Sequence, residues 1–193
     1  IEAEFGFEVG QLSFSLERSG QGASTLGNWI TAQLRHVTQA DVGLYNAGGI
    51  RSDFAAGPVT RGDVFQVFPF SNSVVRFEVT GSELLGIVLD NLTSLKDGNH
   101  GALQCSGISL TWRDRLGSPE VVSLTVNGKP FDPASTYTVA TNSYVVEQAA
   151  KYLAGAEPKN TAAQGMTVYE LALEAFSAGR LTLDSTQPFQ KVE

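Results

Sequence analysis

The sequence predicts a mixed α+β fold in which mixed sheets are flanked by helices. Segments with helical apolar spacing and segments with strand-like alternation follow one another, but without the strict strand–helix alternation of a doubly wound sheet. The chain has 193 residues, of which 42% are hydrophobic and 17% are charged. This length and composition allow a packed core and exclude a disordered chain. We therefore expect one domain over residues 1–193.

The first half of the chain carries two clear helix signals. One helix is predicted from Ser24 or Thr25 to about Val37, because apolar residues recur on one face. A second is predicted after Thr80 by the same spacing through Leu92. A capping box, in which a Thr and an acidic residue three positions on cap a helix start, is predicted at Thr60 and Asp63 and opens a short helix through Phe65. Short alternating or apolar runs predict strands at 4–9, 12–16, 42–45 and 74–79.

The second half is richer in strands. They are predicted at 108–112, 121–126 and 137–141, with Asn127-Gly128 as a hairpin turn. Helices are predicted at 144–153 and 167–178, the second with a capping box of Thr167 and Glu170 and with Gly179 as its stop. A last short strand is expected at 181–183.

Charge and composition exclude several classes of function. The net charge is −7, and no basic stripe is present, so we expect no nucleic-acid partner. No apolar run approaches the roughly 20 residues of a membrane-spanning helix. The single cysteine, Cys105, excludes an internal disulfide. The first residues have no signal-peptide pattern, and the missing initial Met indicates a piece of a longer protein.

The sequence offers no metal site or catalytic machinery that we can identify. Its two histidines, His36 and His100, lie in no recognisable metal-binding motif. It also lacks the nucleophile elbow of α/β-hydrolases and the phosphate-binding P-loop. We therefore expect no catalytic residue, no metal and no cofactor in this chain.

Three short segments are candidates for ligand binding. Asn46 ends a predicted strand, and its amide can donate to and accept from a heterocycle. Gly48 and Gly49 follow it and allow a ligand to approach the backbone closely. Arg51 offers a planar guanidinium group that suits phosphate. The same pattern also fits an ordinary tight turn with a surface arginine. The other two segments hold Phe70 with Asn72, and Tyr144; the two rings are either a stacking platform for a base or plain core.

Taken together, these segments resemble the C-terminal, substrate-binding domain of the 5′-nucleotidase family. The resemblance rests on NAGGIR at 46–51, VTRGDVFQVFPFSN at 59–72 and VTGSELLGIVLDN at 79–91. It continues with TLGNWITAQL at 25–34, GALQCSGISLTW at 101–112, TYTVATNSY at 136–144 and GRLTL at 179–183. The match therefore runs in order along nearly the whole chain and implies the fold of that domain.

The resemblance implies a binding role for these residues. Phe70 and Tyr144 would stack on both faces of a nucleoside base, Asn46 would contact the base, and Arg51 would contact the phosphate or nearby polar groups. Asn72 would add a weaker polar contact. The resemblance also implies that phosphate-ester hydrolysis takes place on two divalent metal ions held by an N-terminal metallophosphoesterase domain, which is absent from this chain and would be its partner. It implies export to the periplasm, the cell surface or the medium.

Two departures from the family pattern leave other functions open. The Asp that binds the ribose hydroxyls in the family is replaced by Ala150, and the family's Arg before the first helix has no clear counterpart, since Arg18 lies a few residues early. One alternative is a degenerate binding module of the same fold for a non-nucleotide ligand or a protein partner. A further alternative is a structural domain that supports oligomerisation.

Overall fold

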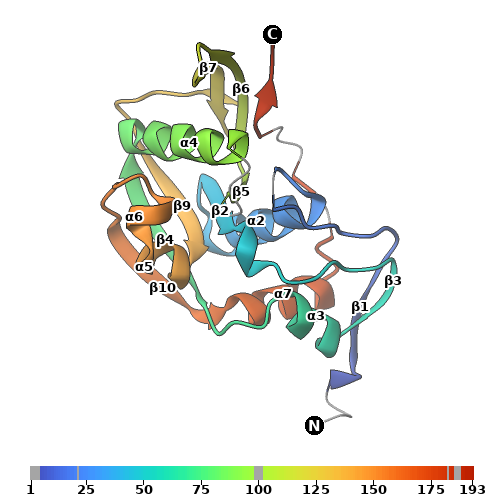
Figure 1. The fold of residues 1–193 in the computed structure, drawn as a ribbon. Coiled ribbons are helices and arrows are strands. Elements are labelled where there is room, and N and C mark those ends of the chain that lie inside the picture. The colour runs from blue at the N-terminus through green and yellow to red at the C-terminus, as the bar shows by residue number, and fades with distance from the viewer. Residues whose placement is uncertain (1–4, 21, 98–101, 182, 185–187) are drawn as a thin grey trace.

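A five-stranded sheet lies at the centre of the fold in the computed structural model (Figure 1). The structure describes residues 5–20, 22–97, 102–181, 183–184 and 188–193. The central strands run in the order β10-β4-β9-β2-β5; β2 and β9 are parallel, and all other neighbours are antiparallel. They are β2 (Val42–Asn46), β4 (Ser73–Thr80), β5 (Leu103–Ser106), β9 (Thr136–Asn142) and β10 (Lys159–Thr167). This mixed sheet confirms the predicted α+β class.

Two smaller sheets lie beside the central one. A two-stranded sheet pairs β1 (Glu8–Leu12) with β3 (Gly57–Thr60). A four-stranded sheet has the order β11-β6-β7-β8 and consists of β6 (Ile108–Arg115), β7 (Ser118–Val126), β8 (Lys129–Pro130) and β11 (Gln190–Lys191). The predicted turn at Asn127-Gly128 joins β7 to β8, and both residues have the positive φ that such a hairpin turn requires.

Helices cover both faces of the central sheet. They are α2 (Thr25–Thr38), the 3₁₀ turn η1 (Ala47–Gly49), α3 (Arg61–Val67), α4 (Gly81–Lys96), α5 (Ser143–Glu147), α6 (Ala149–Tyr152) and α7 (Val168–Ser177). Neighbouring residues of one strand belong to different clusters: Leu44 packs in the cluster with α4, and Tyr45 in the cluster with α2 and α7. Because successive strand side chains point to opposite faces, the sheet separates two hydrophobic clusters.

Capping boxes fix where several helices begin. Within the described residues they are found at α3, α4 and α7, with the pairs Thr60 and Asp63, Thr80 and Glu83, and Thr167 and Glu170. The first and the last confirm predicted boxes. Hydrogen bonds from the threonine backbone and hydroxyl hold the pKa of Glu83 and of Glu170 below the usual value. Each of these helices therefore begins at the residue that its local sequence dictates.

Some predicted elements are wrong. No strand covers the expected range 12–16. The strand β1 ends at Leu12, and beyond it Leu16 forms an isolated bridge to Phe54. The strand expected at 4–9 begins at Glu8, with residue 4 outside the described part of the chain. The helix expected at 144–153 is divided at Gln148 into α5 and α6. Leu181 and Leu183 are not in a strand, and position 182 lies outside the described residues.

Several strands escaped prediction because their sequences carry little apolar alternation. The clearest case is β10, whose residues KNTAAQGMT are polar or small and mostly exposed. It forms because the edge of β4 offers unpaired backbone groups, not because its own side chains need burial. His100, one of the two histidines of the sequence, lies outside the described residues. No helix in the described ranges is long and apolar enough to cross a membrane.

The close contact between α2 and β2 predicts that one added methyl group at Gly43 lowers the stability of the fold. A Cβ at Gly43 would lie 2.3 Å from the carbonyl oxygen of Thr31 in α2. We expect Gly43→Ala to lower the free energy of unfolding by about 2–3 kcal/mol, since neither backbone can yield cheaply. The matched control is Gly86→Ala in α4, where no atom lies within 4 Å of the new Cβ and a helical alanine adds up to about 1 kcal/mol. Urea unfolding followed by circular dichroism measures both, and equal stability of Gly43→Ala and the wild type contradicts the direct contact.

Candidate functional site

The topology of the sheet gathers the candidate residues at one edge. β2 and β9 run parallel, so their carboxyl ends, Asn46 and Asn142, lie at the same edge of the sheet. β4 is antiparallel to β9 and pairs Val74 with Asn142, so the loop that leads into β4 also lies there. In mixed and parallel sheets, the carboxyl ends of parallel strands are the usual place for a ligand.

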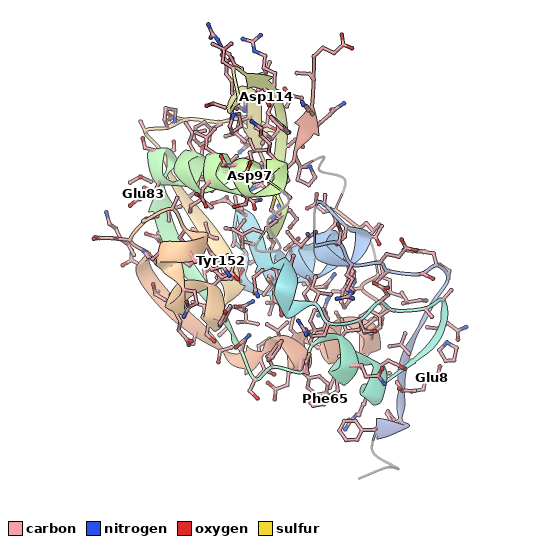
Figure 2. All side chains as sticks on the ribbon, in the orientation of Figure 1. Glu8, Phe65, Glu83, Asp97, Asp114 and Tyr152 are labelled. Atoms are coloured by element: carbon pink, nitrogen blue, oxygen red, sulfur yellow. The ribbon has the colours of Figure 1, made fainter. Side chains whose placement is uncertain are left out.

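A cavity of about 350 Å³ opens at this edge. Its lining includes six of the seven residues that the sequence indicated, namely Asn46, Gly48, Gly49, Phe70, Asn72 and Tyr144. Lys151 and Tyr152 of α6 complete the lining, and Figure 2 shows the position of Tyr152 on that helix. The cavity thus joins four segments that are far apart in the sequence.

Two aromatic side chains of the cavity are partly exposed. Phe70 is 45% exposed and Tyr144 is 37% exposed, which leaves part of each ring accessible from solvent. The Tyr144 ring packs against the buried ring of Tyr152, with centroids 6.1 Å apart and a tilt of 59°. The Ser73 N–H donates to Oγ of Ser143 at 3.3 Å, which ties the strand after Phe70 to the helix that carries Tyr144.

A chain of hydrogen bonds fixes the amide of Asn46. The N–H of Val145 donates to Oδ1 of Asn142 at 3.0 Å, so the other end of the Asn142 amide must be its nitrogen. That nitrogen donates to Oδ1 of Asn46 at 2.8 Å. Because the oxygen of Asn46 is occupied within the buried network, the group that Asn46 has left to offer a ligand is its amide N–H.

The glycines after Asn46 let the turn η1 lie close against this network. A Cβ at Gly49 would lie 2.9 Å from the Tyr45 ring and 3.1 Å from Nδ2 of Asn46, so a larger residue would displace the amide. Gly48 is exposed, and a Cβ there would meet no atom within 4 Å. Below them Tyr45 is buried, which raises the pKa of its hydroxyl.

Arg51 does not line the cavity of the two rings. It lines a neighbouring cavity of about 430 Å³ together with Arg18. Gly48 belongs to the lining of both cavities, so they adjoin at η1. Arg51 Nη1 donates to the Gly48 carbonyl at 3.2 Å, and Arg18 Nη1 lies 3.5 Å from the Ile50 carbonyl. Arg18 lies a few residues before the position at which the family carries an arginine, and it shares this cavity with Arg51.

Sequence reasoning missed three residues of this region. Lys151 and Tyr152 lie on a four-residue helix without periodicity, and Asn142 ends a strand as polar residues often do. Of the three, Asn142 had a local signal, since an asparagine before a short helix is a typical cap. The sequence left the role of Arg18 open. The backbone N–H of Arg18 donates to Oδ1 of Asp53, which lies 35 residues further along the chain, and this contact brings Arg18 close to Arg51.

The lining of the ring cavity consists of two glycines, two asparagines, three aromatic residues and one lysine among the described residues. Among the described residues that line the cavity there is no carboxylate, histidine or thiol to act as acid, base or nucleophile. In the described ranges, no group of three or more His, Cys, Asp or Glu side chains is placed to hold a metal ion. Cys105 is buried, which raises its pKa and leaves the thiol unreactive.

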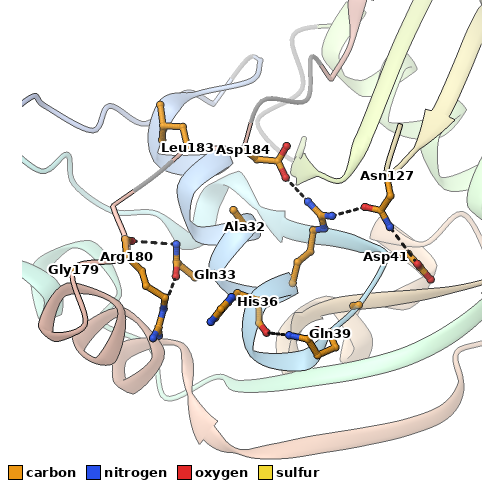
Figure 3. A pocket seen from close by; sticks show the side chains of 12 residues that line it. Ala32, Gln33, His36, Gln39, Asp41, Asn127, Gly179, Arg180, Leu183 and Asp184 are labelled. Atoms are coloured by element: carbon orange, nitrogen blue, oxygen red, sulfur yellow. Dashed lines mark hydrogen bonds and ion pairs between the residues drawn. The ribbon is translucent and has the colours of Figure 1, made fainter. Parts of the chain in front are cut away.

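A larger cavity, of about 680 Å³, lies elsewhere and is polar (Figure 3). Its arginines contact other residues of the lining: Arg35 contacts Asp184 and Asn127, and Arg180 Nε donates to Oε1 of Gln33 at 3.2 Å. These contacts fasten the chain after α7 to α2. No aromatic side chain is part of its described lining. The cavity at the end of β2 and β9 is therefore the better candidate.

Comparison with known proteins gives a consistent result. A family model described as "5′-nucleotidase, C-terminal domain" matches residues 6–155. Protein UshA of Escherichia coli is 30% identical over 147 residues, which cover 75% of this chain and 25% of that protein. Endonuclease YhcR of Bacillus subtilis is 29% identical over 139 residues, covering 71% and 11% respectively. The chain thus spans a quarter or less of the length of these curated relatives.

Solved structures share the fold over the full chain. The 5′-nucleotidase precursor of Thermus thermophilus has a TM-score of 0.86 at 22% identity, covering 100% of this chain and 41% of that one. The NAD nucleotidase of Haemophilus influenzae has a TM-score of 0.80 at 20% identity, covering 100% and 39%. At such identities the likeness establishes the fold.

The asparagine network predicts a specific loss of stability. Asn142→Ala removes the cap of α5 and leaves the buried oxygen of Asn46 without its donor. We expect the free energy of unfolding to fall by about 2–3 kcal/mol in urea titrations. Asn142→Ser separates the two contacts, since a serine hydroxyl still caps α5 but is too short to reach Asn46; we expect a loss of about 1–2 kcal/mol, smaller than that of Asn142→Ala. Wild-type stability in Asn142→Ala would mean that this network does not hold the site.

Proposed function

This chain belongs to the family of 5′-nucleotidase C-terminal domains, and we propose that it binds the nucleotide or nucleoside in a metal-dependent 5′-nucleotidase-type phosphoesterase. One observation carries the proposal. Two partly exposed rings, Phe70 and Tyr144, come from separate segments and line a cavity whose buried wall is Asn46. A flat base that stacks on such rings gains about 1–3 kcal/mol for each contact.

Each of the seven residues that the sequence indicated has a role in this proposal. Phe70 and Tyr144 hold the base, and the Asn46 amide donates to an acceptor on its edge. Gly48 and Gly49 allow the ligand to approach the main chain, and Asn72 adds a polar contact. The 5′-phosphate extends past Gly48 toward Arg51 and Arg18, whose guanidinium groups suit phosphate oxygens.

Phosphate-ester hydrolysis is assigned to a part of the parent protein outside this chain. We propose that an N-terminal metallophosphoesterase domain holds two divalent metal ions and that this domain presents the substrate to it. The lining of the ring cavity supports this division, because its side chains include no carboxylate, histidine or thiol among the described residues. The same resemblance supports export of the parent, and a family neighbour is described as a precursor.

Calorimetric titration with adenosine, AMP and a UDP-sugar tests the proposal. We expect Phe70→Ala and Tyr144→Ala each to weaken binding of the nucleoside part by about fivefold to 150-fold, because each removes about 1–3 kcal/mol of stacking. Phe65→Ala is the matched control, since Phe65 is an equally exposed ring, 46%, outside the cavity. Absence of binding to all three ligands favours a degenerate module with another ligand or a protein partner.

The second cavity gives a separate prediction for the phosphate. We expect Arg51→Met to weaken binding of AMP about fivefold while adenosine is unaffected, since an exposed charge pair contributes up to about 1 kcal/mol. Raising the salt concentration from about 50 to about 500 mM reduces the advantage of AMP over adenosine in the wild type. Equal loss for AMP and adenosine would instead place Arg51 against the base or the sugar.

A further inference from the structure

Gln104 is a buried amide of the edge strand β5 that bonds to a single loop before α2. Its side-chain nitrogen Nε2 donates to the carbonyl oxygens of Ser19 at 3.2 Å and of Gly22 at 2.7 Å. Its oxygen Oε1 accepts from the backbone N–H and from the hydroxyl of Ser24, both at 3.0 Å. These contacts span 80 to 85 positions of the sequence. A residue of the sheet thus supplies the polar interior of a loop that is distant in the chain.

The orientation of this amide is determined by its partners. A backbone N–H can only donate and a carbonyl can only accept, so the oxygen of Gln104 must face Ser24 and its nitrogen must face Ser19 and Gly22. Gln104 is 1% exposed, and a Cβ at Gly27 would overlap its amide group, so α2 lies directly against it. Loss of the amide would therefore leave partly buried backbone groups of the loop without partners.

The two ends of the loop are joined at its base. The N–H of Glu17 donates to Oγ1 of Thr25 at 2.8 Å, and the N–H of Leu26 donates to the carbonyl of Glu17 at 3.0 Å. Compact surface loops with adjacent ends usually pack on their own side chains. Here the contacts in the middle of the loop come from Gln104 instead, so this one side chain has a large share in the conformation of the loop.

The loop carries Arg18 to the second cavity. The carbonyl of Ser19, the next residue, is held by Gln104, and the backbone N–H of Arg18 donates to Oδ1 of Asp53 at 2.7 Å. The backbone is thus fixed on both sides of the Arg18 side chain, which is exposed and lines the cavity of about 430 Å³ together with Arg51. A backbone that is held before a ligand arrives loses less conformational entropy on binding.

We propose that Gln104 is a positioning residue that holds Arg18 at the cavity where the phosphate of a nucleotide is expected. The proposal rests on the function proposed above. Gln104 itself touches no ligand in this arrangement, because it is not among the described residues that line the ring cavity or the cavity of Arg18. Its effect on phosphate binding therefore passes through the loop.

Tryptic cleavage after Arg18 tests the contact without any ligand. Gln104→Met keeps the length of the side chain but removes its donors and acceptors, and Gln104→Glu is a milder change that replaces the donor to Ser19 and Gly22 by an oxygen. We expect either variant of the full 193-residue chain to be cleaved after Arg18 at least fivefold faster, since cleavage follows the population of the opened loop. Mass spectrometry of the fragments measures the rate.

Two controls separate opening of the loop from a general loss of stability. Ser24→Ala removes the hydroxyl that caps α2 and one contact to Gln104, but leaves the donors to Ser19 and Gly22 in place; we expect its rate of cleavage to change less than twofold. Cleavage after Arg115, which lies at the exposed turn between β6 and β7, is expected to keep its rate in every variant. An unchanged rate after Arg18 in Gln104→Met overturns the proposal.

Titration with adenosine and AMP gives a readout that a merely structural role would not change. We expect Arg18→Met and Gln104→Met each to weaken binding of AMP about threefold to fivefold and to leave adenosine binding unchanged. The double variant loses no more than either single one, because both changes act on the same contact. Wild-type preference for AMP in Gln104→Met, or an equal loss for adenosine and AMP, overturns the positioning role.

The outcomes also separate this inference from the proposed function. If the wild type binds adenosine but AMP no more tightly, the positioning role of Gln104 is wrong and the nucleoside site stands. If the wild type binds neither ligand, the proposed function fails and the role of Gln104 in phosphate binding fails with it. Faster cleavage after Arg18 together with a selective loss of AMP binding supports both.

Discussion

The site depends on two asparagines that end neighbouring parallel strands. Asn142 uses its oxygen to cap α5 and its nitrogen to hold the oxygen of Asn46, so one side chain fixes both a helix and an amide. Both residues are buried, where an unmatched amide would cost about 1–3 kcal/mol. The helix that carries Tyr144 and the strand that carries Asn46 are therefore held in one arrangement.

The rest of the site consists of a buried wall and of aromatic rings that are partly exposed. The wall is built on buried residues: Tyr45 packs edge-to-face against Phe68, with centroids 6.0 Å apart. Two residues after Phe68 the chain has left the core, and the ring of Phe70 is partly exposed. A rigid aromatic residue on a well-packed base loses little conformational entropy when a ligand binds. The rings are thus available for contact while their backbone stays in place.

The sequence predicted the parts of this arrangement that have local causes. The capping box of Thr167 with Glu170 and the helix α2 are determined by residues that are close together in the sequence, and the sequence therefore predicted both. The NAGGIR segment and both rings were identified as candidates, but the pairing of β9 with both β2 and β4 is what brings them to one cavity. Lys151 could not be predicted, because its place depends on the break at Gln148 that starts α6. Arg51 was expected beside the rings and lies in the adjoining cavity because η1 turns the chain between them.

The overall negative charge of the chain does not oppose an anionic ligand at this place. The net charge of −7 is a sum over the whole chain, and at physiological salt a charge is screened beyond about 8 Å. The charged side chains among the described lining of the two cavities are all cations, namely Lys151, Arg51 and Arg18. A nucleotide is rich in acceptors along one side, from the ring nitrogens of its base to its phosphate oxygens. In the proposed function, short-range hydrogen bonds from charged donors outweigh a distant, screened repulsion, so the net charge of the chain does not argue against an anionic ligand.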